Sequence, residues 1–168
     1  MKPNRSEMQA ATIDWMSQTI NQCTYAVTLT LKPYTTDDGK FREQLDEGKA
    51  KVNFDQFLKR LNYAIFGNAA RRSNKKSITV IPVLEGRASG KLLHYHCAIG
   101  GIPDYASESH LRKLIAEAWH GTRFGNQQID VKKITDAIGW LSYITKEMRR
   151  NTDAFDVENI RISSTVRC

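Results

Sequence analysis

Two histidines one residue apart, His94 and His96, lie in the apolar stretch KLLHYHCAIGG (residues 91–101) and are the first candidates for chemistry. In a β-strand, residues i and i+2 point to the same side, so both imidazoles would share one face. The opposite face would then belong to the core, and it comprises Leu93, Tyr95, Cys97 and Ile99. A structural histidine is usually a single residue on the apolar face. The paired arrangement therefore favours a functional site, although two histidines alone do not establish that it binds metal.

Glu85 can complete such a site, because it ends the strand-like run that precedes His94. A tight turn at Ser89-Gly90 would pair Glu85 with His94 across a hairpin, with their Cβ atoms about 5 Å apart on one face. We therefore predict that Glu85, His94 and His96 converge on one divalent cation. Two imidazoles and a carboxylate leave positions open for water and substrate, and suit Mn²⁺ or Mg²⁺. Pro82 indicates an edge strand or a bulge, and a bulge would shift this register by one.

A nucleophile is offered by Tyr143, within a helix predicted at residues 136–150. At about 100° per residue, Tyr143 lies away from the apolar stripe of that helix, which comprises Ala137, Leu141, Ile144 and Met148. Lys146 is three residues further on, so its ammonium group neighbours the phenol and could favour the phenolate or hold a phosphate oxygen. The alternative is an ordinary surface pair of tyrosine and lysine. The glutamate and histidine hairpin in the same chain favours the catalytic interpretation.

The elements that must position these residues alternate between helices and antiparallel-looking hairpins. Ser6 and Gln9 form a predicted capping box for the first helix, and the polar residues 34–51 are predicted to be a mobile loop. Further helices are expected at residues 52–66, from Ser107 and at 136–150, and strands at 24–32, 77–85, 92–99, 128–134 and 158–164. This order predicts an α+β fold with one mainly antiparallel sheet and helices packed on it. The lack of regular βαβ spacing argues against a Rossmann-type domain.

A formal net charge of +7 in 168 residues favours a polyanionic partner. The residues predicted to contact nucleic acid are Arg71, Arg72, Lys75, Lys76, Arg149 and Arg150, with Thr28 and Thr30 lining the site face of their strand. A solvated loop and a cation-rich helix C-terminus explain the two basic clusters equally well.

Cysteine usage and hydropathy exclude several other classes. The three cysteines are widely spaced without a CxxC pair, which argues against a zinc ribbon or a thioredoxin-type redox motif. The N-terminal residues have no apolar core typical of a signal peptide, and no apolar run is long enough to span a membrane. We therefore expect a cytoplasmic protein that does not associate with membranes.

Three motifs in this order resemble the HUH endonuclease superfamily, in particular single-tyrosine replication initiators of the Rep type. They are the apolar strand YAVTLTLKP, the His94-Tyr95-His96 triplet with Glu85 upstream, and the YxxK motif formed by Tyr143 and Lys146. Tyr95 is bulkier than the usual aliphatic residue between the two histidines. The resemblance covers roughly residues 24–150.

The resemblance implies a five-stranded, mostly antiparallel sheet with a divalent metal ion held by Glu85, His94 and His96. It also implies site-specific nicking and joining of single-stranded DNA through a 5′-phosphotyrosine on Tyr143, with Lys146 assisting, as at a rolling-circle origin. The implied partners are single-stranded DNA, including a stem-loop origin, and a host replication helicase. We expect a single domain over residues 1–168, with a core at 23–150, an N-terminal helix at 1–22 and a C-terminal extension at 151–168.

Other functions remain open from the sequence. A catalytically inactive DNA-binding module of the same fold would bind stem-loops without cutting them, and a hydrolase using activated water would cleave without Tyr143. A single-tyrosine transposase is the nearest relative within the same class, although the lysine of the YxxK motif favours an initiator. A relaxase fits less well, because relaxases commonly carry a three-histidine cluster.

Overall fold

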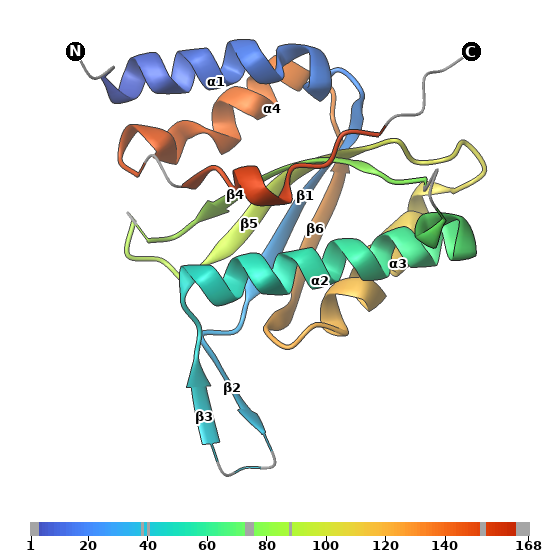
Figure 1. The fold of residues 1–168 in the computed structure, drawn as a ribbon. Helices are drawn as coiled ribbons and strands as arrows, with labels where there is room; N and C mark the ends of the chain where they lie inside the picture. Colours follow the sequence, from blue (N-terminus) through green and yellow to red (C-terminus); the bar gives the residue numbers. More distant parts are fainter. Residues whose placement is uncertain are drawn as a thin grey trace.

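The computed structural model describes residues 4–163 apart from 38, 40, 73–75, 88 and 152–153 (Figure 1). Within these residues the chain forms four α-helices, six strands and short 3₁₀ helices. In order they are α1 (Arg5–Ile20), β1 (Cys23–Leu31), β2 (Tyr34–Asp37), β3 (Phe41–Gln44), α2 (Glu47–Phe66), η1 (Gly67–Arg71), β4 (Thr79–Glu85), β5 (His94–Gly100), α3 (Glu108–His120), β6 (Gly125–Lys133), α4 (Ala137–Ile144), η2 (Lys146–Arg149) and η4 (Val157–Asn159). None of the helices in this described part is both long and apolar enough to cross a membrane.

The main sheet has the strand order β4-β5-β1-β6, and all its pairings are antiparallel. The α+β prediction is therefore confirmed, but the described residues give this sheet four strands instead of five. The strand expected at 158–164 is reduced to an isolated bridge between Arg161 and Val80, and Ser164 lies outside the described residues. A second bridge joins Phe155 to Val83, so the segment from Ala154 to Arg161 follows the outer edge of β4.

Pro82 lies in an edge strand, as expected for a residue that has no backbone N–H to donate to a neighbouring strand. β4 is the outermost strand, and its register with β5 runs from Thr79 to Glu85 without a shift. The carbonyl of Pro82 points outward and accepts a hydrogen bond from the backbone N–H of Asp156. The ring nitrogen lies on the same side as this carbonyl, so its missing N–H costs the β4–β5 ladder nothing.

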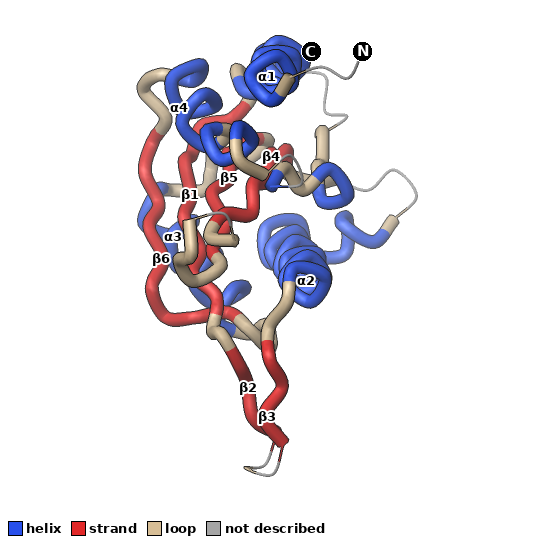
Figure 2. Tube along the Cα trace, turned by 90° about the vertical axis from the view of Figure 1, so that its left-hand side faces the viewer, coloured by secondary structure: helices blue, strands red, loops and turns tan. Residues whose placement is uncertain are grey.

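Helices cover both faces of the sheet. One face packs against α2 and α3, where the buried side chains include Val27, Leu29, Phe54, Phe57, Tyr95, Cys97, Leu111, Ile115 and Trp119. The other face packs against α1 and α4, which lie side by side (Figures 1 and 2), and its buried side chains include Met16, Ile20, Ile81, Val83, Ala98, Leu141 and Ile144. Fully burying a Leu, Ile or Phe side chain contributes about 2 kcal/mol, so these two layers supply the main driving force for folding.

On the face that packs against α1 and α4, the side chains change from apolar to polar along the strands. On β4 the inward series is Ile81, Val83 and Glu85, and on β5 it is Ala98, His96 and His94. The apolar residues of the two series lie under α1 and α4. The polar residues Glu85, His94 and His96 occupy the end of the sheet where the β4–β5 hairpin turns. The fold therefore places the predicted ligands at the boundary of a core layer.

Residues 34–51 do not form the predicted loop. They form the β2–β3 hairpin, which projects from the body of the molecule (Figures 1 and 2), and then the first turns of α2, which begins at Glu47 with Asp46 as its N-cap. In the hairpin, the guanidinium carbon of Arg42 lies 3.7 Å from the centre of the Tyr34 ring. Because this hairpin packs neither face into a core, its sequence lacks the apolar alternation by which strands are recognised.

Two helix ends also differ from the predictions. The capping box of α1 is formed by Asn4 and Glu7 instead of Ser6 and Gln9. The helix expected over residues 136–150 ends at Ile144, and the 3₁₀ helix η2 continues it. The hydroxyl of Thr145 donates to the carbonyl of Leu141 at this junction, an interaction that competes with a regular helical continuation.

Candidate metal and tyrosine site

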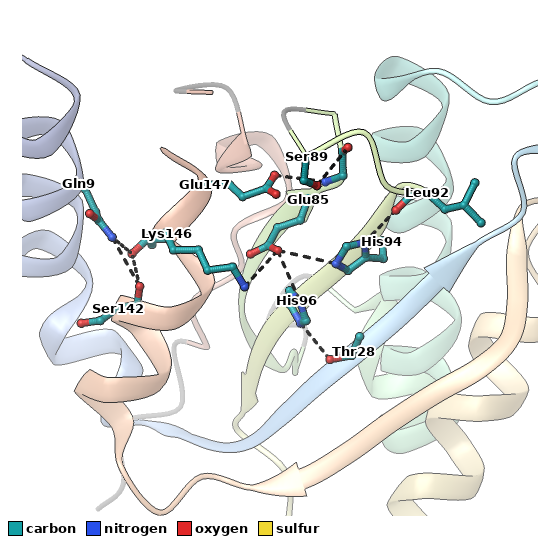
Figure 3. Close-up of polar contacts among 12 residues, drawn as sticks. Gln9, Thr28, Glu85, Ser89, Leu92, His94, His96, Ser142, Lys146 and Glu147 are labelled. Atoms are coloured by element: carbon teal, nitrogen blue, oxygen red, sulfur yellow. Dashed lines mark hydrogen bonds and ion pairs between the residues drawn. The ribbon is translucent and has the colours of Figure 1, made fainter. Parts of the chain in front are cut away.

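Glu85, His94 and His96 converge as predicted. Glu85 and His94 are direct cross-strand partners in the β4–β5 hairpin, and His96 lies two residues further along the same face. The Nε2 atoms of His94 and His96 are 3.7 and 3.6 Å from Oε2 of Glu85 (Figure 3). One ligand atom from each residue lies within 4.8 Å of the other two, so the three side chains could hold a metal ion.

Both imidazoles are oriented by contacts at their other nitrogen. Nδ1 of His94 is 2.9 Å from the carbonyl oxygen of Leu92, which can only accept, so this nitrogen carries the proton. Nδ1 of His96 is 2.9 Å from the hydroxyl of Thr28 on the neighbouring strand β1. A hydrogen bond at Nδ1 fixes the ring and leaves Nε2 as the ligand atom, as in many metal sites. Thr28 therefore lies on the site face of β1, as predicted, and there it orients the His96 ring.

The Glu85 carboxylate is almost fully buried, with a relative exposure of 3%. Burial favours a raised pKa, but the neighbouring His94, His96 and Lys146 outweigh it and hold the pKa of Glu85 below its ordinary value. Its second oxygen, Oε1, is buried and has no hydrogen-bond partner among the described residues. A buried carboxylate with one unpaired oxygen, and with the other oxygen beside two Nε2 atoms, fits a divalent cation, which would satisfy all three side chains.

The two histidines differ in their protonation. The adjacent Glu85 carboxylate raises the pKa of His94, despite the opposing effect of burial. Burial lowers the pKa of His96 to about 4, so this imidazole is neutral at physiological pH. Of the two rings, His94 is therefore the one that stays doubly protonated to the higher pH in the metal-free protein.

Metal affinity is accordingly expected to fall as the pH is lowered. A coordinating imidazole must be neutral, and the raised pKa of His94 means that its proton is retained above the usual value of about 6.5. Below that pKa, the affinity for Mn²⁺ should fall about tenfold for each pH unit, with one proton released per ion bound. Calorimetric titration between about pH 6 and 8, in buffers of different ionisation enthalpy, measures both quantities. An affinity that stays constant across this range would contradict the assignment of His94 as a ligand.

Helix α4 brings Tyr143 and Trp140 against the cluster of Glu85, His94 and His96. The ring centres of Tyr143 and Trp140 are 5.5 and 5.8 Å from that of His96, and the two rings stack on each other at 5.4 Å. Tyr143 keeps 47% of its surface exposed, as a residue that meets a substrate must. Its predicted position away from the core stripe is confirmed, whereas the place of Trp140 beside His96 could not be seen from the helix alone.

Lys146 contacts both Tyr143 and the candidate metal ligand Glu85. Figure 3 shows its Nζ atom beside Glu85, at 3.4 Å from Oε2. The same atom lies 3.6 Å from the centre of the Tyr143 ring. Lys146 lies in η2 instead of the α-helix, yet it remains beside Tyr143 as the i+3 spacing predicts. A divalent ion at Glu85 would compete with this ammonium group for the same oxygen. The lysine would then be displaced from this oxygen.

A hydrogen bond between Glu147 and Gly86, which the sequence did not reveal, holds the end of the strand that carries Glu85. Oε2 of the buried Glu147 accepts a hydrogen bond from the backbone N–H of Gly86, directly after Glu85. Gly86 has a φ of 124°, and a Cβ there would lie 2.6 Å from the carbonyl oxygen of Leu92. Only glycine fits this turn, and the contact ties η2 to the end of the ligand strand.

The predicted nucleic-acid contacts are divided between the two ends of the molecule. Arg71, Arg72 and Lys76 precede the start of β4, and Glu85 is at its other end, about 20 Å away for a seven-residue strand (Figure 1). Arg149 and Arg150 follow Lys146 and are exposed near the site, while the hydroxyl of Thr30 donates to the carbonyl of Gln128. Lys75 lies outside the described residues.

Comparison with known proteins does not identify a family. No family model, no curated protein and no solved structure matches this chain.

Proposed function

We propose that this protein is a metal-dependent nuclease of the HUH type that nicks and rejoins single-stranded DNA through Tyr143, in the manner of a rolling-circle replication initiator. The observation that carries the proposal is the meeting of two separate elements. Helix α4 and η2 place a phenol and an ammonium group directly against the cluster of Glu85, His94 and His96 at the end of the β4–β5 hairpin. The lysine of the YxxK motif favours an initiator over a single-tyrosine transposase.

Glu85, His94 and His96 would hold the metal, Mn²⁺ or Mg²⁺. When bound, it would polarise the scissile phosphate and offset the charge that develops on its oxygens. Thr28 and the carbonyl of Leu92 keep both Nε2 atoms directed at the site, so the ligands need little rearrangement to bind.

Tyr143 would supply the nucleophile. Its phenolic oxygen forms a bond to phosphorus while the bond from phosphorus to the 3′-oxygen breaks; the phenol loses its proton and the released 3′-oxygen gains one. The product is a 5′-phosphotyrosine and a free 3′-hydroxyl. One ester replaces another, so attack by a 3′-hydroxyl can reverse the step and join strands without a further energy source. Lys146 would stabilise the phenolate and orient the phosphate.

The surroundings of Tyr143 suit a polynucleotide. On one side is a pocket of about 330 Å³, lined by Trp140 and by Lys132 and Lys133 of β6. On the other is a pocket of about 300 Å³ that includes Lys146 and Arg149. Aromatic rings offer stacking surfaces for bases and cations bind phosphates, so both kinds of contact with single-stranded DNA are available beside the tyrosine.

The test is to incubate the protein with a pool of labelled single-stranded oligonucleotides, including stem-loops, in the presence of Mn²⁺, and to separate the products on a denaturing gel. A band of protein joined covalently to DNA, dependent on metal, supports the proposal. Cleavage without such a band would overturn it in favour of a hydrolase that uses water. Stem-loop binding without any cleavage would overturn it in favour of a DNA-binding module.

A further inference from the structure

A pocket that is not lined by Glu85, His94 or His96 lies between α1 and η2. It has a volume of about 300 Å³, and the polar side chains that line it are Ser6, Gln9, Ser142, Lys146 and Arg149. The remaining lining residues, Ala10 and Ile13, are apolar, so no carboxylate is among the described residues that line it. No acid lines the pocket beside the guanidinium group of Arg149, which makes it attractive to an anion, while the ammonium group of Lys146 contacts Glu85 in the metal-free protein.

Gln9 organises this pocket. It is one of the few buried polar residues of α1, with an exposure of 5%, and its side-chain NH₂ group lies 3.3 Å from the hydroxyl of Thr145 and 3.5 Å from the carbonyl of Ser142. Its amide oxygen accepts a 2.6 Å hydrogen bond from Nε of Arg149. A surface arginine normally samples many rotamers, and this contact removes part of that freedom before any ligand arrives.

The pocket adjoins the metal cluster through Lys146. This side chain lines the pocket and also reaches Oε2 of Glu85 at 3.4 Å (Figure 3). An anion in the pocket and a phosphate at the cluster would therefore lie on two sides of one lysine. Two consecutive phosphates of a single strand could occupy the pocket and the cluster at the same time. An isolated small anion would occupy only one of them.

We propose that Arg149, held by Gln9, and Lys146 bind a phosphate of single-stranded DNA next to the one that Tyr143 attacks. This proposal rests on the nuclease function proposed above and names a substrate contact that the N-terminal helix supports through Gln9. The planar guanidinium group matches two phosphate oxygens, and the hydroxyl-bearing Ser6 and Ser142 complete a polar lining. The pocket sets the strand in register with the tyrosine.

The proposal is tested by fluorescence anisotropy of a labelled twenty-nucleotide oligothymidine, with EDTA present so that no cleavage occurs. Arg149→Gln should weaken binding about tenfold at low salt and reduce the slope of log affinity against log salt by about 0.7, the value for one phosphate contact of a single strand. The matched control is Arg60→Gln, which removes the same charge from an exposed residue of α2, on the opposite face of the sheet from the pocket. It should retain the wild-type slope. Equal losses in both variants would overturn the proposal.

A second measurement needs no substitution. In a proton–nitrogen NMR titration of the wild-type protein with the same oligonucleotide, the Nε–H resonance of Arg149 and the amide resonances of Gln9 should shift together. Unchanged resonances at saturation would overturn the proposal. The covalent-adduct assay is independent of both measurements: its failure alone would remove the nuclease function and leave a DNA-binding pocket, and failure of the Arg149 tests alone would leave the nuclease without this contact.

Discussion

Replacing Tyr143 by phenylalanine is expected to abolish the covalent protein–DNA adduct and to reduce strand cleavage by about 10⁴-fold or more, because the oxygen that attacks phosphorus is removed. The aromatic ring remains, so its contacts with His96 and Trp140 should persist. Mn²⁺ affinity and melting temperature should therefore stay close to those of the wild type. The measurements are a denaturing gel for the adduct, calorimetry for the metal and a thermal melt for the fold.

Tyr63→Phe is the matched control for this experiment. Tyr63 lies on α2 with an exposed fraction of 46%, nearly that of Tyr143, and its ring is covered by Arg71 instead of facing the metal cluster. This variant should form the adduct at the wild-type rate. If Tyr143→Phe still cleaves DNA efficiently, the nucleophile is a water molecule and the role given to Tyr143 is wrong.

Replacing Glu85 by glutamine is expected to lower the affinity for Mn²⁺ by more than about 100-fold, since even residues that only support ligands cost 10- to 100-fold. The substitution keeps the shape of the side chain and removes its negative charge. It also leaves the ammonium group of Lys146 beside two imidazoles without the carboxylate that all three contact. Both effects oppose a divalent cation, and isothermal calorimetry with Mn²⁺ measures their sum.

Glu147→Gln provides the comparison, because Glu147 is also a buried glutamate near the cluster. Its carboxylate accepts from the backbone of Gly86 and is not part of the three-residue group. We expect a loss of less than about tenfold in Mn²⁺ affinity, below the cost of losing a direct hydrogen-bond partner of a ligand, because Glu147 contacts no ligand side chain and glutamine keeps an oxygen that can accept from Gly86. Similar losses in the two variants would mean that general negative charge, and not ligation by Glu85, attracts the metal.

The candidate site was predictable where local rules decide the geometry. Alternation along a strand put His94 and His96 on one face, and turn length fixed Glu85 opposite His94. The helical period likewise separated Tyr143 from the buried residues of α4. Each inference uses residues close in sequence, for which backbone geometry leaves few alternatives.

The contacts that were missed depend on pairing between distant segments. Thr28 reaches His96 because β1 lies beside β5 in a particular register, and Gln9 reaches Arg149 because α1 lies beside η2. A one-residue change of register would move Thr28 to the other face, and nothing in either strand alone specifies the pairing. The cap of α1 was missed for a different reason, since Asn4 with Glu7 and Ser6 with Gln9 are similar capping pairs one half-turn apart.

The segment along the outer edge of β4 has a consequence for how the protein behaves in solution. Backbone groups of Val80 and Pro82 point away from the sheet and are engaged by Arg161 and Asp156. Without these partners, β4 would offer a flat, apolar edge to any other strand, and edge-to-edge pairing between molecules is a common route to aggregation. A chain cut before Ala154 would keep the metal ligands and the tyrosine but expose this edge. What the sequence presents as a tail is the element that stops one molecule's sheet from continuing into the next.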